Sequence, residues 1–166
     1  MEVDANQLCY RCHGTIGTSA SLGLAERLSR IYRGLQEVIA RYQPTGVSLE
    51  KVFFSRNVQS ALKLGQARGV ALLAAAENHL DVAEYSAAEI KVAVVGYGQA
   101  TKEQVQKMVG ALLCLRSPMR ADAADALAAA ICHIHRRRYD KLMDPTSRGR
   151  AKVASWRDYN EKASRR

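Results

Sequence analysis

The sequence predicts an α/β fold, because apolar segments with the spacing of β-strands alternate along the chain with segments that have the spacing of amphipathic helices. The chain has 166 residues, of which 48% are hydrophobic, and this is enough for one domain with a sizeable core. Its apolar runs are too short to cross a bilayer, and its acidic start lacks the apolar segment of a signal peptide. We therefore expect a cytoplasmic protein without a membrane partner.

Periodicity and end signals place the individual elements. The strongest helical pattern covers residues 21–42, where apolar residues recur at steps of three and four and Pro44 follows the end. Asn57 and Thr101 are good N-cap residues for two further helices. In chain order, the expected elements are a strand at 7–18, a helix at 21–42, a strand at 45–54 that emerges from the core at Glu50, a helix at 57–79, a strand at 81–86, a short helix that begins within 86–91, a loop at 94–101, a helix at 102–115 and a last helix at 121–138.

The positive charge of the chain is concentrated near its end. The net charge is +9, from 25 basic and 16 acidic residues, whereas residues 136–166 alone carry 11 basic and 4 acidic residues, or +7. We therefore expect a folded domain at 1–138 and a basic, poorly ordered tail at 139–166. A basic tail often binds nucleic acid or an acidic membrane surface, and a solvated terminus is the equally simple interpretation.

The motif "CYRCH" at 9–13 has the C-x-x-C-H spacing of a covalent haem attachment site. Covalent haem attachment normally requires export, which the expected compartment disfavours. A zinc site is the second option, but it would need a further close pair of ligands, and Cys114 and Cys132 are far apart in the sequence. We favour a plain interpretation, in which these are small side chains on a strand.

Three carboxylates lie where chemistry is expected. Glu50 ends an apolar strand, which is where α/β sheets place functional groups. Asp122 and Asp125 are three residues apart in the first turn of the last helix, so both face the same side. Such a group suits Mg²⁺, and two ions of this kind can hold the attacking and leaving oxygens of a phosphodiester. Without a metal, Asp122 and Asp125 would only complement the helix dipole, and Glu50 would only face water; these are the alternative interpretations.

Basic and aromatic residues near these acids suit contact with DNA. Lys91 and Lys102 flank the glycine-containing loop at 96–98, where they could hold a phosphate, although solvated lysines are the simpler interpretation. Phe53 and Phe54 follow the strand-end glutamate. An aromatic ring in this place could stack on an unpaired base, and core packing is the alternative for at least one of the two.

Three long blocks closely resemble the RuvC family of Holliday-junction resolvases. They are "SLEKVFFSRNVQSALKLGQARGV", "VAVVGYGQATKEQVQKMV" and "RADAADALAAAICHIH", and the match runs almost without gaps from Gln7 to His135. The resemblance implies an RNase H-like fold, with a mixed five-stranded sheet flanked by helices. It also implies a homodimer that cuts four-way DNA junctions symmetrically with Mg²⁺, for which Mn²⁺ can substitute, and that works with the RuvA and RuvB branch-migration proteins.

The resemblance carries roles to positions of this sequence. The acids Glu50, Asp122 and Asp125 match the metal-binding glutamate and the two C-terminal catalytic acids of the family. The other matched positions are Phe53, which corresponds to the aromatic that stacks at the opened junction, and Lys91 and Lys102, which correspond to basic residues that contact DNA near the scissile phosphate. The helix with "LGQARG" resembles the dimer-forming helix of the family.

One family motif has no counterpart in this chain. The family begins with a strand that ends in Asp-Pro-Gly, and this aspartate completes the catalytic acids. The only Asp-Pro here is Asp144-Pro145, and Asp4 is expected in the turn before the edge strand at 7–18. We therefore expect the first strand and most of the second to be missing from this chain. The alternative to an active nuclease is a catalytically impaired paralogue or fragment that binds junctions without cutting them.

Overall fold

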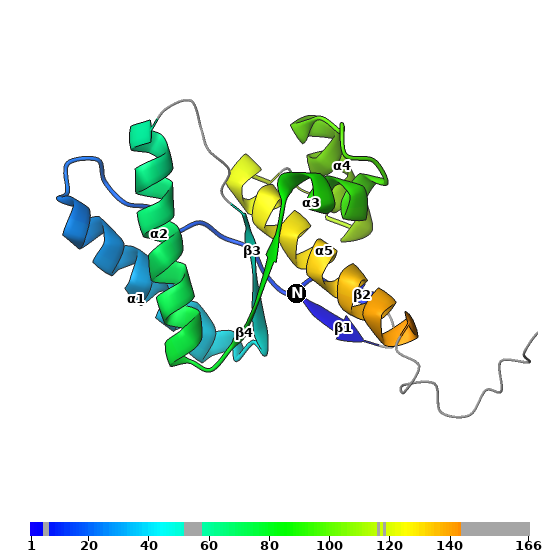
Figure 1. The fold of residues 1–166 in the computed structure, drawn as a ribbon, viewed down its shortest axis with the longest axis horizontal. Coiled ribbons are helices and arrows are strands. Elements are labelled where there is room, and N and C mark those ends of the chain that lie inside the picture. The colour runs from blue at the N-terminus through cyan, green and yellow to red at the C-terminus, as the bar shows by residue number, and fades with distance from the viewer. Residues whose placement is uncertain (5–6, 52–57, 116, 118, 144–166) are drawn as a thin grey trace, which may run out of the picture. The chain divides into compact units, whose positions relative to one another are not determined.

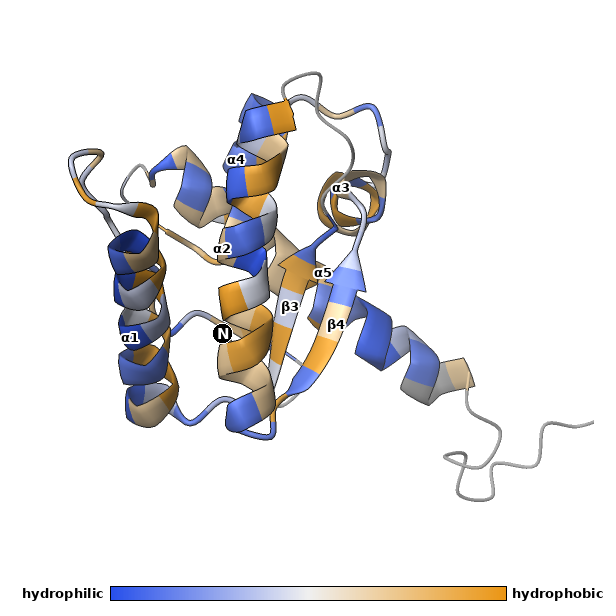
Figure 2. Cartoon of the chain, turned by 60° about the vertical axis from the view of Figure 1, so that its left-hand side comes forward, coloured by the Kyte–Doolittle hydropathy of each residue, from blue (hydrophilic) through white to orange (hydrophobic). Residues whose placement is uncertain are grey.

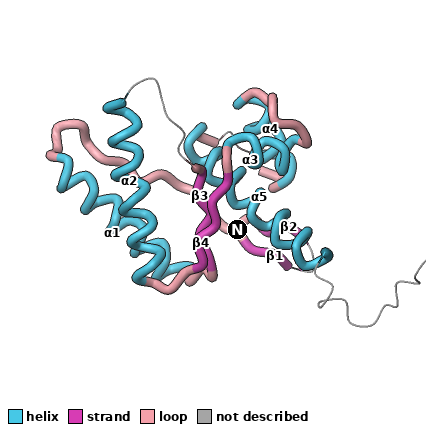
Figure 3. Tube along the Cα trace, in the orientation of Figure 1, coloured by secondary structure: helices cyan, strands magenta, loops and turns pink. Residues whose placement is uncertain are grey.

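Strands and helices alternate along the chain, which confirms the predicted α/β class (Figures 1 and 3). The structure is a computed structural model that describes residues 1–4, 7–51, 58–115, 117 and 119–143. Residues Met1–Arg136 form one unit, and the last turns of the final helix belong to a second unit, Arg137–Arg166. The elements are β1 (Glu2–Asp4), β2 (Gln7–Cys9), α1 (Leu24–Tyr42), β3 (Gly46–Glu50), α2 (Val58–Glu77), β4 (Asp81–Tyr85), α3 (Ala87–Val95), α4 (Lys102–Leu112) and α5 (Ala121–Met143).

The described strands form two separate pairs. β1 and β2 are antiparallel, with Glu2 opposite Cys9, and β3 and β4 are parallel, with Glu50 opposite Tyr85. Within the described part of the chain, β3 is hydrogen-bonded to β4 alone. This arrangement is consistent with the expectation that the first strand and most of the second of a five-stranded sheet are missing.

The start of the chain differs from the prediction. The strand expected at 7–18 is limited to Gln7–Cys9, because β1 pairs with only three residues of it and no described strand lies beside residues 10–19. Asp4 does not lie in a turn before this strand, as we expected, but ends β1 opposite Gln7. The irregular segment instead packs on α1, where the side chain of Ile16 occupies the space that a Cβ at Gly34 would need.

Local capping explains where α3 and α4 begin and where α3 ends. Each begins with a capping box, in which Ser86 pairs with Glu89 and Thr101 with Gln104. α3 runs to Val95, further than predicted, and ends at Gly96, whose φ of 96° favours glycine. The loop expected at 94–101 therefore starts only at Gly96. α4 starts at Lys102 as predicted and stops at Leu112, three residues early.

The remaining helices follow the predicted pattern, with differences at their ends. α5 continues to Met143, five residues beyond the predicted end. α2 ends at Glu77, and its expected cap at Asn57 lies outside the described residues, as does the last part of the strand predicted at 45–54. Among the helices in the described ranges, none is both long and apolar enough to span a membrane.

The buried core joins α3, α4 and α5. Val109, Ile131 and Cys132 are its largest fully buried side chains, and residues of all three helices belong to the same cluster. α1 and α2 are less enclosed. α1 turns its apolar side toward α2 (Figure 2) but has no fully buried residue, and α2 leaves Leu62, Leu64 and Leu73 exposed.

Two valines of α3 test this description of the core. Val94 is 6% exposed and Val92 is 52% exposed on the same helix. We expect Val94→Ala to lower the free energy of unfolding by about 1–3 kcal/mol, because it removes two buried carbon atoms and leaves a cavity. The matched change Val92→Ala should cost less than about 0.5 kcal/mol. Urea unfolding of both variants measures the difference, and equal losses would contradict this core.

Candidate active site

Glu50 lies where the sequence predicted it, at the end of a strand. It is the last residue of β3, and its side chain is exposed. The next residue is tied to the neighbouring strand, because the backbone N–H of Lys51 donates to the carbonyl oxygen of Tyr85 at 2.7 Å. Glu50 therefore projects from a backbone that is fixed on the β4 side.

Asp122 and Asp125 both lie in the first two turns of α5. The helix begins at Ala121, and both carboxylates face water, with side-chain exposures of 77% for Asp122 and 47% for Asp125. Arg120 lies 4.0 Å from Asp122, and Lys102 lies 4.0 Å from Asp125. Exposed pairs at such a distance contribute between about 0 and 1 kcal/mol, so a metal ion could displace them at little cost.

The fold brings these acids to the same end of the molecule. The carboxyl end of β3 lies beside the amino end of α5 in both Figure 1 and Figure 2. No three His, Cys, Asp or Glu side chains of the described residues come close enough together to hold a metal ion. The three acids therefore lie along the same edge of the fold, but their side chains are not close enough together to form a metal site. Their exposed carboxylate oxygens are nevertheless donors that suit Mg²⁺, an ion that keeps several waters.

The predicted DNA-binding residues have different positions relative to this edge. Lys102 is the first residue of α4 and extends into solvent next to Asp125, with 80% of its side chain exposed. Lys91 lies within α3 and is half-buried. Phe53 and Phe54 lie outside the described residues. The structure therefore places Lys102 directly beside a candidate ligand.

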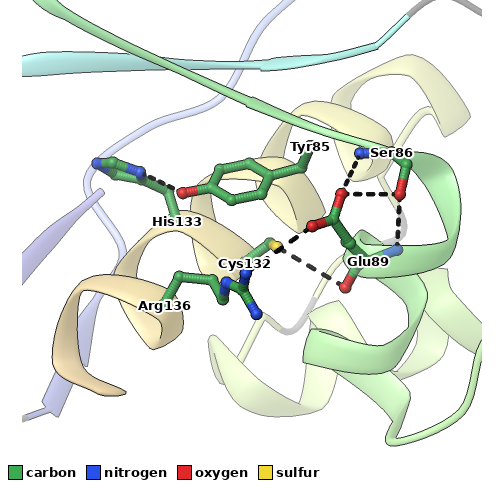
Figure 4. A network of polar contacts seen from close by, with 6 residues as sticks. All are labelled: Tyr85, Ser86, Glu89, Cys132, His133 and Arg136. Atoms are coloured by element: carbon green, nitrogen blue, oxygen red, sulfur yellow. Dashed lines mark hydrogen bonds and ion pairs between the residues drawn. The ribbon is translucent and has the colours of Figure 1, made fainter. Parts of the chain in front are cut away.

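A polar network that we did not predict connects the end of β4 to α5 (Figure 4). The Tyr85 hydroxyl lies 2.9 Å from Nδ1 of His133, and the Cys132 thiol donates to the carbonyl oxygen of Glu89 at 3.7 Å. Arg136 lies 3.9 Å from the Glu89 carboxylate. Hydrogen bonds from the backbone N–H and the hydroxyl of Ser86 lower the pKa of Glu89 below its ordinary value. The spacing of Ser86 and Glu89 was the one signal in the sequence that could have revealed part of this network.

The "CYRCH" segment takes part in local contacts. The Tyr10 hydroxyl lies 2.8 Å from Nδ1 of His13. A hydrogen bond with Cys12 raises the pKa of Tyr42 at the end of α1. Cys9 and Cys12 are half-buried thiols. These contacts join the irregular segment to α1.

Comparison with known proteins identifies the family. The family model described as "Crossover junction endodeoxyribonuclease RuvC" matches residues 1–133. The chain belongs to the RuvC family. The RuvC of Syntrophotalea carbinolica is 54% identical over 135 residues, which cover 81% of this chain and 84% of that protein. The RuvC of Pelobacter propionicus is 48% identical over 159 residues, covering 96% and 89%.

The RuvC likeness extends to the three-dimensional structure. The solved structure described as "T. thermophilus RuvC in complex with Holliday junction substrate" matches with a TM-score of 0.78 at 34% identity, and covers 84% of this chain and 85% of that one. The match confirms an RNase H-like α/β fold. The family resemblance and the class of enzyme, a nuclease of the hydrolase type, are likewise confirmed.

The cysteines of this chain should differ in reactivity. Burial raises the pKa of the Cys132 thiol to about 11, whereas Cys114 is exposed. We expect Cys114 to react quickly with a disulfide reagent at pH 8 and Cys132 to react only after denaturation, because the thiolate is the reactive form. Mass spectrometry of the labelled peptides measures this, and equally fast labelling of Cys132 in the native protein would contradict it.

The raised pKa of Cys132 also makes the stability of the folded chain depend on pH, and the direction of this dependence follows from the shift. Because the folded chain holds Cys132 protonated, its contribution to stability is complete below pH 9.0, the ordinary value, and is lost as the pH rises toward about 11. Cys132→Ala should reduce this alkaline loss.

Proposed function

We propose that this chain is a structure-selective endonuclease that resolves Holliday junctions by symmetric hydrolysis of phosphodiesters during DNA recombination and repair. The observation that supports it best is the likeness of the fold to a RuvC structure that holds a Holliday junction substrate. The identity of about half of all aligned positions with proteins named RuvC supports the same reaction.

We propose that Glu50, Asp122 and Asp125 hold Mg²⁺, with Mn²⁺ as a substitute. Their oxygens are the ligands that this ion prefers, and their exposure leaves room for water and for phosphate. When bound, the ion would supply positive charge at the attacking and leaving oxygens of the cleaved bond. The three carboxylates would position this ion at the end of β3 and the start of α5.

The proposed contacts to DNA come from three further residues. Lys91 and Lys102 would bind phosphates near the scissile bond, and Phe53 would stack on a base at the opened junction. The partners are a second copy of the chain, joined through the helix with "LGQARG", and the RuvA and RuvB complex. We assign the nuclease domain to 1–138, a basic tail to 139–166 and the cytoplasm as the site of action.

A junction-binding protein with impaired catalysis is the second candidate. It is favoured by the observation that the described carboxylates do not form a three-ligand group. Such a protein would retain the basic contacts, because affinity for DNA arises mainly from neutralised phosphates. A cleavage assay on a synthetic four-way junction with Mg²⁺ separates the two candidates.

Removal of a candidate ligand should separate cutting from binding. We expect Glu50→Gln and Asp122→Asn each to lower the cleavage rate at least about a hundredfold, because each loses a charge that holds the metal. Junction affinity in the absence of metal should stay within about twofold of the wild type. The control Glu37→Gln changes an exposed acid of α1 and should cut normally. Cleavage by Glu50→Gln at the wild-type rate would remove Glu50 from the site.

Loss of a lysine that binds phosphate should reduce the salt dependence of junction binding. We expect Lys91→Ala and Lys102→Ala to weaken junction binding several-fold, and each to reduce the slope of log affinity against log salt by about 1. Lys107→Ala removes the same charge from an exposed position further along α4 and serves as the comparison. Fluorescence anisotropy at several salt concentrations gives the slopes. An unchanged slope for Lys102→Ala would show that this residue makes no phosphate contact.

A further inference from the structure

Tyr85 touches both elements that carry the candidate metal ligands. Through its backbone it is the register partner of Glu50 and accepts a hydrogen bond from the N–H of Lys51 at 2.7 Å. Through its side chain it reaches α5, where its hydroxyl lies 2.9 Å from Nδ1 of His133 (Figure 4). A single residue thus connects the strand that ends in Glu50 to the helix that carries the two aspartates.

A second attachment holds the same face of α5. Cys132 and Arg136 both contact Glu89, the former at the carbonyl oxygen and the latter at the carboxylate. Glu89 in turn closes the capping box with Ser86, the residue that follows Tyr85. The end of β4 and the start of α3 therefore contact α5 at three residues within little more than one turn, Cys132, His133 and Arg136.

We propose that Tyr85 and His133 are positioning residues for the metal site: their hydrogen bond fixes the separation between Glu50 on β3 and the aspartates of α5. The inference rests on the proposed metal-dependent function. His133 lies eight residues beyond Asp125, or roughly 12 Å along the helix axis, so it acts through the helix and not on the reacting atoms.

The chemistry of the ion explains why this separation matters. Mg²⁺ requires nearly ideal octahedral geometry with short bonds, so a small displacement of one carboxylate weakens the whole set. Glu50 and the two aspartates belong to different elements, and β3 is hydrogen-bonded to β4 alone among the described strands. The route from Glu50 to α5 through Tyr85 is therefore short and made of directional contacts.

The test compares two tyrosines that each lose a hydroxyl. Tyr85→Phe removes the bond to His133 but keeps the ring, whose centroid lies 6.0 Å from that of His133. Tyr32→Phe is the matched control, because the Tyr32 hydroxyl also joins two elements, by bonding to Glu77 of α2 from α1. Mn²⁺ affinity is measured from the electron paramagnetic resonance signal of the free ion. Cleavage of a four-way junction is then followed as a function of Mg²⁺ concentration.

We expect Tyr85→Phe to weaken Mn²⁺ binding roughly three- to tenfold, the size of one lost hydrogen bond, and to raise the Mg²⁺ concentration at half-maximal cleavage in parallel. Cleavage at saturating Mg²⁺ should recover. Tyr32→Phe should leave both values unchanged, even if its melting temperature falls. An unchanged Mn²⁺ affinity in Tyr85→Phe, or an equal loss in Tyr32→Phe, would overturn the proposal.

Variants of His133 provide the second arm. His133→Asn keeps a polar atom near the position of Nδ1 and should retain most of the Mn²⁺ affinity, whereas His133→Ala should lose as much as Tyr85→Phe. The double variant Tyr85→Phe/His133→Ala should lose no more Mn²⁺ affinity than either single change, because both changes remove the same hydrogen bond. Additive losses would overturn the coupling. A wild-type chain that binds Mn²⁺ but cuts no junction would refute the nuclease function alone, and the Mn²⁺ affinities would still decide the role of Tyr85.

Discussion

The burial of small side chains along α5 is the constraint on which the candidate site depends. Ala123 and Ala124 are each 2% exposed, and Ala128 and Ile131 continue the buried face in the next turns. Asp122 and Asp125 flank the two alanines, so burial of one pair turns the other pair to solvent. A larger residue at an alanine position would force the helix away from the core, and the carboxylates would move with it.

The parallel pair of β3 and β4 imposes the second constraint. Side chains of a strand alternate between its two faces, so a slip of one residue would turn Glu50 to the opposite side. In the observed register Gly46 stands opposite Asp81, where a Cβ would approach the Asp81 carbonyl oxygen to 3.1 Å, and Glu50 stands opposite Tyr85. Glu84 of β4 also pairs with Arg68 of α2. Strand register and helix burial together thus determine which carboxylates face the edge shared by the carboxyl end of β3 and the amino end of α5.

The sequence was informative wherever the signal is local. The helical periodicity of α1, the cap at Thr101 and the strand end at Glu50 can all be recognised from a few neighbouring residues, and the structure contains them. The prediction of a strand at 7–18 was wrong in its length for the opposite reason. The length of a strand depends on the strand that pairs with it, and β1 pairs only with Gln7–Cys9. The contact of Tyr85 with His133 spans 48 positions and has no periodic signal, so only the folded chain reveals it. The roles of Glu50, Asp122, Asp125, Phe53, Lys91 and Lys102 stay predictions for the experiments above.

The exposed apolar face of α2 has a consequence for how stable this protein is in the cell. Leu62 and Leu73 lie on the same side of the helix, about three turns apart, and are 62% and 52% exposed. The unfolded chain presents no such ordered face. A partner that covers these leucines would therefore bind the folded state alone and stabilise it by RT ln(1 + [L]/Kd). The folding free energy would then vary with the abundance of that partner. If the partner is another copy of the same chain, dilution alone would shorten the lifetime of the protein.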